Sequence, residues 1–244
     1  MFSAPNSVSI FGNAITEHLL VVRQLKEQQG VMEAIARAMT ATLWTGGKIL
    51  WCGNGGSAGD AQHLAAEIVG RFRRERCGLA SVALTTDTSI LTSVANDYGF
   101  DAVFSRQVEA LGAPGDLLVG ISTSGNSRNV LAALETARSQ GMVTVAFTGE
   151  GGGKMAVLAD HLFVVASNET ARIQEAHMLA GHMLCDWIEL DWVHKQSVTK
   201  AFSEASHIEG AELQWARPLG TAALNGLQSS TSLQKLIEAN EGAC

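Results

Sequence analysis

The sequence predicts an α/β fold: a doubly wound, five-stranded parallel sheet flanked by helices in three layers. Three observations favour it. Short, almost wholly apolar runs recur along residues 48–167, segments with helical spacing separate them, and glycine- or serine-rich turns follow two of the runs. Strands buried on both faces of a parallel sheet give such runs, because helices cover both sides. An N-terminal helical hairpin and a C-terminal extension complete the expected architecture.

The helical hairpin is expected over residues 8–46. Apolar residues recur there at intervals of three or four, which places them on one face of a helix. They are Leu19, Leu20, Val22, Leu25, Val31, Ile35, Met39 and Leu43.

Five apolar runs are expected to form the strands. Each is nearly continuous in apolar residues instead of alternating with polar ones, which is typical of a strand without a solvated face. The runs are KILWCG (48–53), SVALTT (81–86), DLLVGIST (116–123), VTVAFTG (143–149) and HLFVVAS (161–167). In such a sheet, ligands are expected in the crevice at the carboxyl ends of the strands.

Between and after the strands, helical spacing predicts helices over residues 57–73 and 126–139, and one long helix over 170–196. We assign residues 1–198 to a single domain that includes the N-terminal helices. Residues 199–244 form a C-terminal extension without a recognisable motif, for which a swapped arm, a short helix and partial disorder stay open.

Composition narrows the possible partners. The 244 residues are 46% hydrophobic and 17% charged, with a formal net charge of -7. The negative net charge argues against electrostatic binding to nucleic acid or to an anionic membrane. The first thirty residues lack a basic region followed by an apolar run, and no window of about 18 uncharged apolar residues occurs. We therefore expect a soluble, cytoplasmic protein.

The glycine-rich turn after the first strand run suits three functions. Residues 53–58 match the loose G-x-G-x-x-A dinucleotide pattern, but Asp87 comes too late in the chain to be its ribose-binding acid. GGSAG (55–59) matches a nucleophile elbow, yet the later histidines lie at a strand start or mostly on a helix instead of on loops. The third possibility is a cradle at a helix N-terminus, where N–H groups and the helix dipole bind an anion or sugar hydroxyls.

A second polar turn favours the cradle. In DLLVGISTSGNSRNV (116–130), a strand is followed at once by hydroxyl and amide side chains and then by a helix. Ser122, Thr123, Ser124 and Ser127 offer about the donor set that a phosphate dianion needs. An ordinary helix cap would also explain the cluster. Two such turns at strand ends of one sheet favour a sugar-phosphate site.

Four further side chains suit a metal. His63 and Glu67 are four residues apart, so they lie on one face of their helix. Gln174 and His182 are eight apart, about 80° around the long helix, and so share a side. Imidazole, carboxylate and amide ligands together suit a borderline divalent metal such as zinc. Spacing alone does not bring residues 63 and 182 together; the fold must do so.

The chain resembles the sugar isomerase (SIS) domain family and, within it, the bacterial phosphoheptose isomerases. The resemblance covers residues 10–196 and rests on long blocks, namely CGNGGSAGDAQHLAAEIVGRF, LTTDTSILTSVANDYGFDAVFSRQVEALG, GDLLVGISTSGNSRNV, FTGEGGGKMAVLADH and ARIQEAHMLAGHMLCDWIE. It implies a flavodoxin-like sandwich, a homotetramer and one zinc per subunit. The implied reaction converts sedoheptulose 7-phosphate to D-glycero-D-manno-heptose 7-phosphate for ADP- or GDP-heptose precursors of bacterial glycans such as lipopolysaccharide.

The resemblance also implies the site residues. The zinc ligands would be His63, Glu67, Gln174 and His182. The substrate contacts would be Asn54, Gly55, Gly56, Ser57, Glu67, Asn96, Asp97, Ser122, Thr123, Ser124, Ser127 and Gln174.

Aldose–ketose interconversion moves a proton between C1 and C2 through an enediol, which requires a base, a proton shuttle and a stabilising cation. We assign Glu67 as the base and His182 as its acid/base partner. A zinc-bound carboxylate is a weaker base, so either Glu67 leaves the metal during turnover or the metal mainly orients the site.

Two alternatives come from the same fold: a non-catalytic adaptor that binds the replication initiator protein, and an isomerase of another sugar phosphate. Glu67 and His182 argue against the adaptor, which we expect to lack both. The charged segment 73–76 is expected to be a solvated surface, with Arg71 near the pocket because it lies four residues after Glu67.

Overall fold

A computed structural model describes the backbone of residues 7–215 and the side chains of residues 9–198. The chain divides into two compact units, Met1–Glu189 and Leu190–Cys244, and all features discussed below belong to the first. One helix, α7 (Thr170–Trp215), runs through both units. The long helix expected over 170–196 thus extends further, while residues 216–244 of the expected extension lie outside the described residues.

The expected five-stranded parallel sheet is confirmed. Its strands are β1 (Ile49–Gly53), β2 (Ser81–Ala83), β3 (Leu117–Ser122), β4 (Val143–Thr148) and β5 (His161–Val164), in the order β2-β1-β3-β4-β5. All pairs are parallel. Every residue of β1 and β3 is buried, which explains why these strands read as continuous apolar runs.

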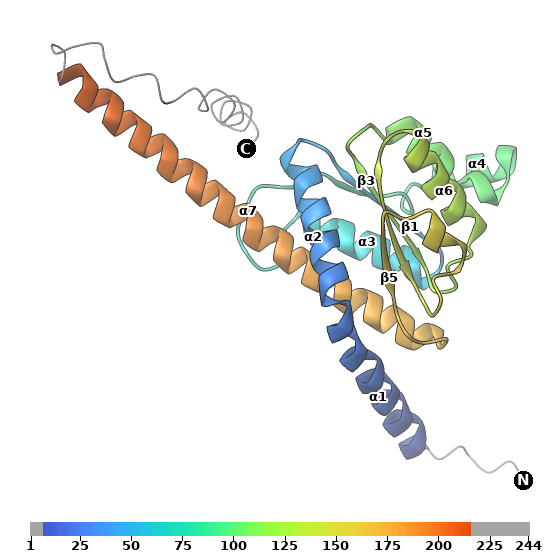
Figure 1. Ribbon diagram of the computed structural model, residues 1–244. Helices are drawn as coiled ribbons and strands as arrows, with labels where there is room; N and C mark the ends of the chain where they lie inside the picture. Colours follow the sequence, from blue (N-terminus) through green and yellow to red (C-terminus); the bar gives the residue numbers. More distant parts are fainter. Residues whose placement is uncertain (1–6, 216–244) are drawn as a thin grey trace, which may run out of the picture. The chain divides into compact units, whose positions relative to one another are not determined.

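Helices cover both faces of the sheet (Figure 1). On one face, α4 (Thr88–Tyr98), α5 (Ser105–Leu111) and α6 (Arg128–Ser139) pack their apolar sides against alternate strand residues such as Leu50 and Leu118. On the other lie α2 (Gln29–Trp44), α3 (Gly56–Val69) and the first part of α7. The chain therefore forms a three-layer sandwich, in which short 3-10 turns η2 (Phe100–Ala102) and η3 (Gly153–Val157) complete the connections.

The expected N-terminal helices are present, but the chain does not reverse between them. A 3-10 turn, η1 (Leu25–Gln28), joins α1 (Ser7–Gln24) to α2, and its flanking residues Gln24 and Gln29 both keep right-handed helical dihedrals. The two helices consequently follow one another end to end (Figure 1) instead of folding back as a hairpin. No helix among the described residues is long and apolar enough to cross a membrane.

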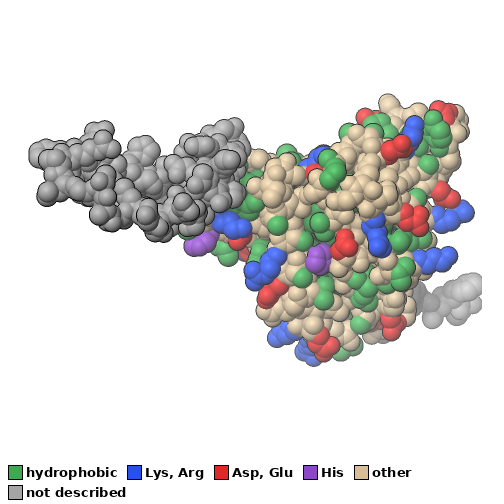
Figure 2. Space-filling model, turned by 45° about the horizontal axis from the view of Figure 1, so that its top comes forward, with side chains coloured by type: hydrophobic (Ala, Val, Ile, Leu, Met, Phe, Trp, Pro, Cys, Tyr) green, Lys and Arg blue, Asp and Glu red, His purple; other side chains and the backbone are tan. Residues whose placement is uncertain are grey.

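The surface mixes charges of both signs. On the face drawn in Figure 2, Lys and Arg side chains are interspersed with Asp and Glu side chains. The ion pairs among the described residues include Arg106 with Glu109 at 2.7 Å.

Candidate active site

The strand order creates a crevice between β1 and β3. The chain leaves β1 toward β2 and leaves β3 toward β4, so the connections diverge from two neighbouring strands whose ends are paired at Gly53 and Ile121. Ligands bind outside the carboxyl ends of strands at such a point. Both polar turns singled out from the sequence begin there.

The glycine turn after β1 brings backbone and side chains close together. Gly55, with φ of 56°, precedes α3, and no side chain caps the helix. A Cβ at Gly56 would lie 2.3 Å from Nε2 of Gln174, so the amide of Gln174 rests against the first turn of α3. A Cβ at Gly53 would lie 2.7 Å from the carbonyl oxygen of Ser57. Space therefore requires glycine at position 53, whereas a side chain at position 56 would displace the amide of Gln174.

The turn after β3 gathers hydroxyl groups. Ser122 Oγ lies 2.9 Å from Ser127 Oγ and 3.4 Å from Ser124 Oγ. Ser127 stands at the N-cap of α6, but its side chain makes no capping bond to that helix. The three serines thus face one another at the beginning of a helix, an arrangement suited to an anion.

A pair of asparagines joins the two turns. Asn54 and Asn129 each donate an Nδ2–H to the other's Oδ1, at 2.8 Å in both directions. Asn129 is buried and was not singled out in the sequence, because its partner lies 75 residues away in the chain. The reciprocal bond fixes the spacing between the glycine turn and the serine turn.

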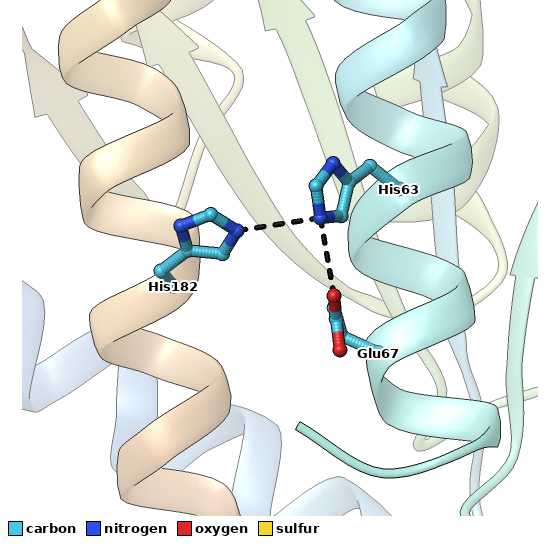
Figure 3. A group of neighbouring side chains, drawn as sticks. All are labelled: His63, Glu67 and His182. Carbon is cyan, nitrogen blue, oxygen red and sulfur yellow. Dashed lines mark hydrogen bonds and ion pairs between the residues drawn. The ribbon is translucent and has the colours of Figure 1, made fainter. Parts of the chain in front are cut away.

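Three of the four expected metal ligands converge (Figure 3). His63 and Glu67 project from α3, and His182 reaches toward them from α7. Glu67 Oε1 lies 3.1 Å from His63 Nε2, which lies 3.3 Å from His182 Nε2. One ligand atom from each residue fits within 4.8 Å of the others. The fold therefore joins residues 63 and 182, as the metal hypothesis required.

These spacings suit zinc. Donors about 2.1 Å from a tetrahedral ion lie about 3.4 Å from one another. The two measured separations are close to that edge length, and each joins atoms that a metal ligand would present. The fourth expected ligand, Gln174, has its amide beside Gly56 at the first turn of the same helix α3.

Asn96 and Asp97 lie on α4, which follows β2. Both are exposed on α4, where Asn96 Nδ2 donates to Asp97 Oδ1 at 2.8 Å. Neither hydrogen-bonds to another candidate residue in the part of the chain that the structure describes. The structure therefore shows no hydrogen bond between Asn96 or Asp97 and the residues of the two polar turns.

One carboxyl group beside the cluster was not singled out in the sequence. Burial raises the pKa of Asp60 to about 6, although the charge of His63 opposes this. Its Oδ2 is buried and has no hydrogen-bond partner among the described residues. This half-buried carboxyl, three residues before His63, adds a proton-holding group to the candidate site.

The charged segment 73–76 is not simply a solvated surface, which corrects the expectation. Arg76 is buried and forms an ion pair with Glu189 at 3.3 Å. Arg71 instead pairs with Glu75 at 3.5 Å, and both side chains are exposed. The side chain that turns inward is thus Arg76.

Comparisons with known proteins identify the family. A family model described as SIS domain matches residues 11–149. The chain belongs to the SIS domain family. Phosphoheptose isomerase of Roseiflexus sp. is 58% identical over 156 residues, which cover 64% of this chain and 79% of the relative. That of Desulfovibrio desulfuricans is 62% identical over 155 residues, covering 64% and 74%.

Solved structures agree. The phosphoheptose isomerase from Neisseria gonorrhoeae matches this SIS domain with a TM-score of 0.72 and 47% identity, covering 75% of this chain and 99% of that one. The one from Francisella tularensis matches with a TM-score of 0.73 and 37% identity, covering 75% and 98%. The resemblance found in the sequence is confirmed, and with it the enzyme class, an aldose–ketose isomerase.

Proposed function

We propose that this SIS domain protein is a zinc-dependent cytoplasmic isomerase that converts sedoheptulose 7-phosphate to D-glycero-D-manno-heptose 7-phosphate. The convergence of His63, Glu67 and His182 carries the proposal, because it supplies a metal-ligating set and a base at one point. The names of the relatives support the reaction. The sequence resemblance supports a homotetramer and a role in supplying ADP- or GDP-heptose precursors.

The two polar turns would bind the substrate. Ser122, Thr123, Ser124 and Ser127 would donate hydroxyl hydrogen bonds to the phosphate, aided by the N-terminal N–H groups of α6. On the other side of the crevice, the uncapped start of α3 offers Ser57 and backbone N–H groups, and Asn54 stands beside it. The proposed contacts from this turn are Asn54, Gly55, Gly56 and Ser57; Asn96 and Asp97 complete the set from α4.

His63, Glu67, Gln174 and His182 would hold the zinc. When bound, it would polarise the oxygens at C1 and C2 and stabilise the negative charge that develops there. Glu67 would take the proton from carbon, and His182 would pass the proton between the two oxygens. Glu67 Oε1 faces His63 in the cluster, and a carboxylate has a second oxygen with which to accept a proton.

The test is to incubate the purified protein with sedoheptulose 7-phosphate, with added zinc or with a chelator, and to follow the aldose by NMR. We expect product with zinc, and at least a hundredfold less from Glu67→Gln or His182→Gln, because loss of a base typically costs about 10²–10⁴ in rate. Glu109→Gln is the matched control, since this exposed carboxylate lies in a surface ion pair.

A folded, zinc-loaded protein that makes no aldose would overturn the proposal. Shorter ketose phosphates offered in the same assay would then test an isomerase of another sugar phosphate. Binding of the replication initiator protein, measured on the same preparation, would test the adaptor.

A further inference from the structure

The connection from α3 to β2 is anchored on one buried carboxylate of α7. Glu189 is fully buried and accepts hydrogen bonds from the backbone N–H groups of Phe72, Arg73 and Arg74, at 2.6, 2.8 and 2.9 Å. Three successive N–H groups that converge on one anion form a nest. Together with the ion pair to Arg76, they engage both oxygens of the carboxylate.

The charge of Glu189 is well compensated. Burial alone would raise its pKa, but the backbone N–H groups and Arg76 outweigh that effect and hold the pKa below its usual value. Glu189 is therefore ionised at neutral pH, and its negative charge tightens each hydrogen bond of the nest. No local sequence pattern indicates these bonds, because the partners are more than a hundred residues apart.

Arg76 extends the anchor to the helix that carries Glu67. Its Nη2 donates to the backbone carbonyl of Glu67 at 2.9 Å, and its Nη1 donates to the carbonyls of Gly70 and Cys77, each at 2.9 Å. The guanidinium thus caps the C-terminal end of α3 by binding carbonyl oxygens there, where the helix dipole favours a cation. Glu189 and Arg76 together connect α7 to the end of α3.

The anchored segment places an aromatic ring on the candidate metal cluster. Phe72 stacks on His182, with ring centroids 5.2 Å apart and planes 21° from parallel. His182 precedes Glu189 by seven residues, about two helical turns, so both project from one side of α7. Besides the nest at Glu189, the segment therefore contacts α7 through Phe72 at His182.

We propose that Glu189 is a positioning residue for His182. Its carboxylate fixes the backbone at Phe72, and the ring of Phe72 then holds the imidazole in the orientation that directs Nε2 toward His63. The relevance to catalysis rests on the proposed function, but the orientation of the ring does not. Groups behind metal-ligating histidines typically change metal affinity or activity about 10- to 100-fold when mutated.

The first test needs neither metal nor substrate. In the metal-free full-length protein, the ring protons of His182 are assigned by comparison with His182→Gln and followed by NMR. A stacked aromatic ring shifts these resonances, so we expect Phe72→Leu to move them toward ordinary histidine values and Phe72→Tyr to leave them nearly in place. Glu189→Gln is expected to move them as Phe72→Leu does, although it leaves Phe72 itself intact.

The matched control is Asp186→Asn. Asp186 also lies on α7 and pairs with the same segment, but through the side chains of Arg73 and Arg74 instead of the backbone. We expect this variant to leave the His182 resonances unchanged. If it moves them as far as Glu189→Gln does, a general loss of charge explains the effect and the positioning role is overturned.

Removing the charge of Glu189 leaves Arg76 buried without its partner and risks unfolding. Glu189→Asp is then tested in the same way, since it keeps the charge and draws the oxygens back from the nest. Unmoved His182 resonances in a folded Glu189 variant overturn the proposal.

Zinc affinity, measured by competition with a chromogenic chelator, is the second readout. We expect Phe72→Leu and the Glu189 variants to bind zinc about 10- to 100-fold more weakly, and Phe72→Tyr and Asp186→Asn to match the parent. Moved resonances with no zinc binding by the parent protein would refute the proposed function while upholding the positioning of His182. Parent-like zinc affinity in Phe72→Leu would refute the link between the stack and the metal cluster.

Discussion

Among single residues, Gly125 bears most directly on the geometry of the serine turn. Its φ is +63°, and a Cβ there would lie 2.2 Å from the carbonyl oxygen of Gly152. Its own carbonyl accepts a hydrogen bond from Met155 N at 3.0 Å. The turn that gathers Ser122, Ser124 and Ser127 is therefore pressed against the loop that follows β4, and only glycine fits the contact.

Gly125→Ala is expected to lower the free energy of unfolding by roughly 2–5 kcal/mol. Left-handed backbone costs about 1–2 kcal/mol for a residue with a Cβ, and overpacking adds about 1–3 kcal/mol. Gly115→Ala is the control, because its φ of +90° is similarly strained while nothing lies within 4 Å of the added Cβ. Urea unfolding of both variants measures the difference; equal losses would mean that the contact with Gly152 is unimportant.

Among the elements, the close packing of α3 against α7 sets the distance across the candidate metal cluster. A Cβ on Gly181 would lie 2.5 Å from Cδ2 of Leu64, which is fully buried. These two residues are the sequence neighbours of His182 and His63. The glycine thus allows the helices to approach closely enough for the two imidazoles to meet.

Gly181→Ala is expected to cost about 1–3 kcal/mol of stability by overpacking and to weaken zinc binding, because the helices must separate or Leu64 must shift. Combined with Leu64→Ala, it should cost less than the sum of the two single changes, since the residues are in contact. Gly30→Ala, in α2 with nothing within 4 Å of the added Cβ, should be neutral or stabilising by up to about 1 kcal/mol. Thermal unfolding and zinc titration provide the measurements, and strictly additive losses would argue against the contact.

The sequence predicted the elements that have a strong periodicity. All five strands were found because burial on both sides excludes polar residues. The helices α4 and α5 were not assigned from spacing, since α4 buries only Val94 and α5 is seven residues long. The absence of a reversal between α1 and α2 depends on the dihedrals of Gln24 and Gln29, which helical spacing does not reveal.

The candidate site was predictable where its residues are neighbours on one element. His63 and Glu67 were paired by their four-residue spacing, and the serine turn by its composition. Phe72, Asn129 and Glu189 were missed because their contacts cross 75 to 117 residues of chain. Tertiary packing creates such contacts, and no local sequence pattern predicts them.

At the scale of the whole molecule, one buried base couples folding to pH. His177 lies among Phe147 and Phe163, and its Nε2 is 3.1 Å from the carbonyl oxygen of Thr148. Burial lowers its pKa from 6.5 to about 4, although the bond to Thr148 opposes this. The folded state therefore keeps the ring neutral, while the unfolded chain takes up a proton as the pH falls below 6.5.

The stability that His177 contributes is thus complete above pH 6.5 and is lost as the pH falls toward 4. Between pH 7 and pH 5 we expect a loss of about 2 kcal/mol from this group. His177→Gln, which retains a donor for Thr148, should show a correspondingly shallower fall in urea-measured stability over that range. Other titrating groups, such as Glu189 and Asp60, are common to both proteins and cancel in the comparison. Parallel curves would show that His177 does not drive the acid sensitivity.

The cluster drawn from α3 and α7 spans 119 residues of chain between His63 and His182. All five strands precede His182, so a chain growing from its N-terminus has synthesised the whole sheet before the second half of the cluster exists. Formation of the sheet already brings the two ends of the chain between His63 and His182 closer together. Most of the entropy cost of closing this loop therefore falls on the folding of the sheet. If the proposed zinc site is correct, the ion would bind to a nearly finished scaffold and would join α3 to α7 last. A nascent chain that ends after β5 would have all five strands but would lack His182, one of the proposed ligands.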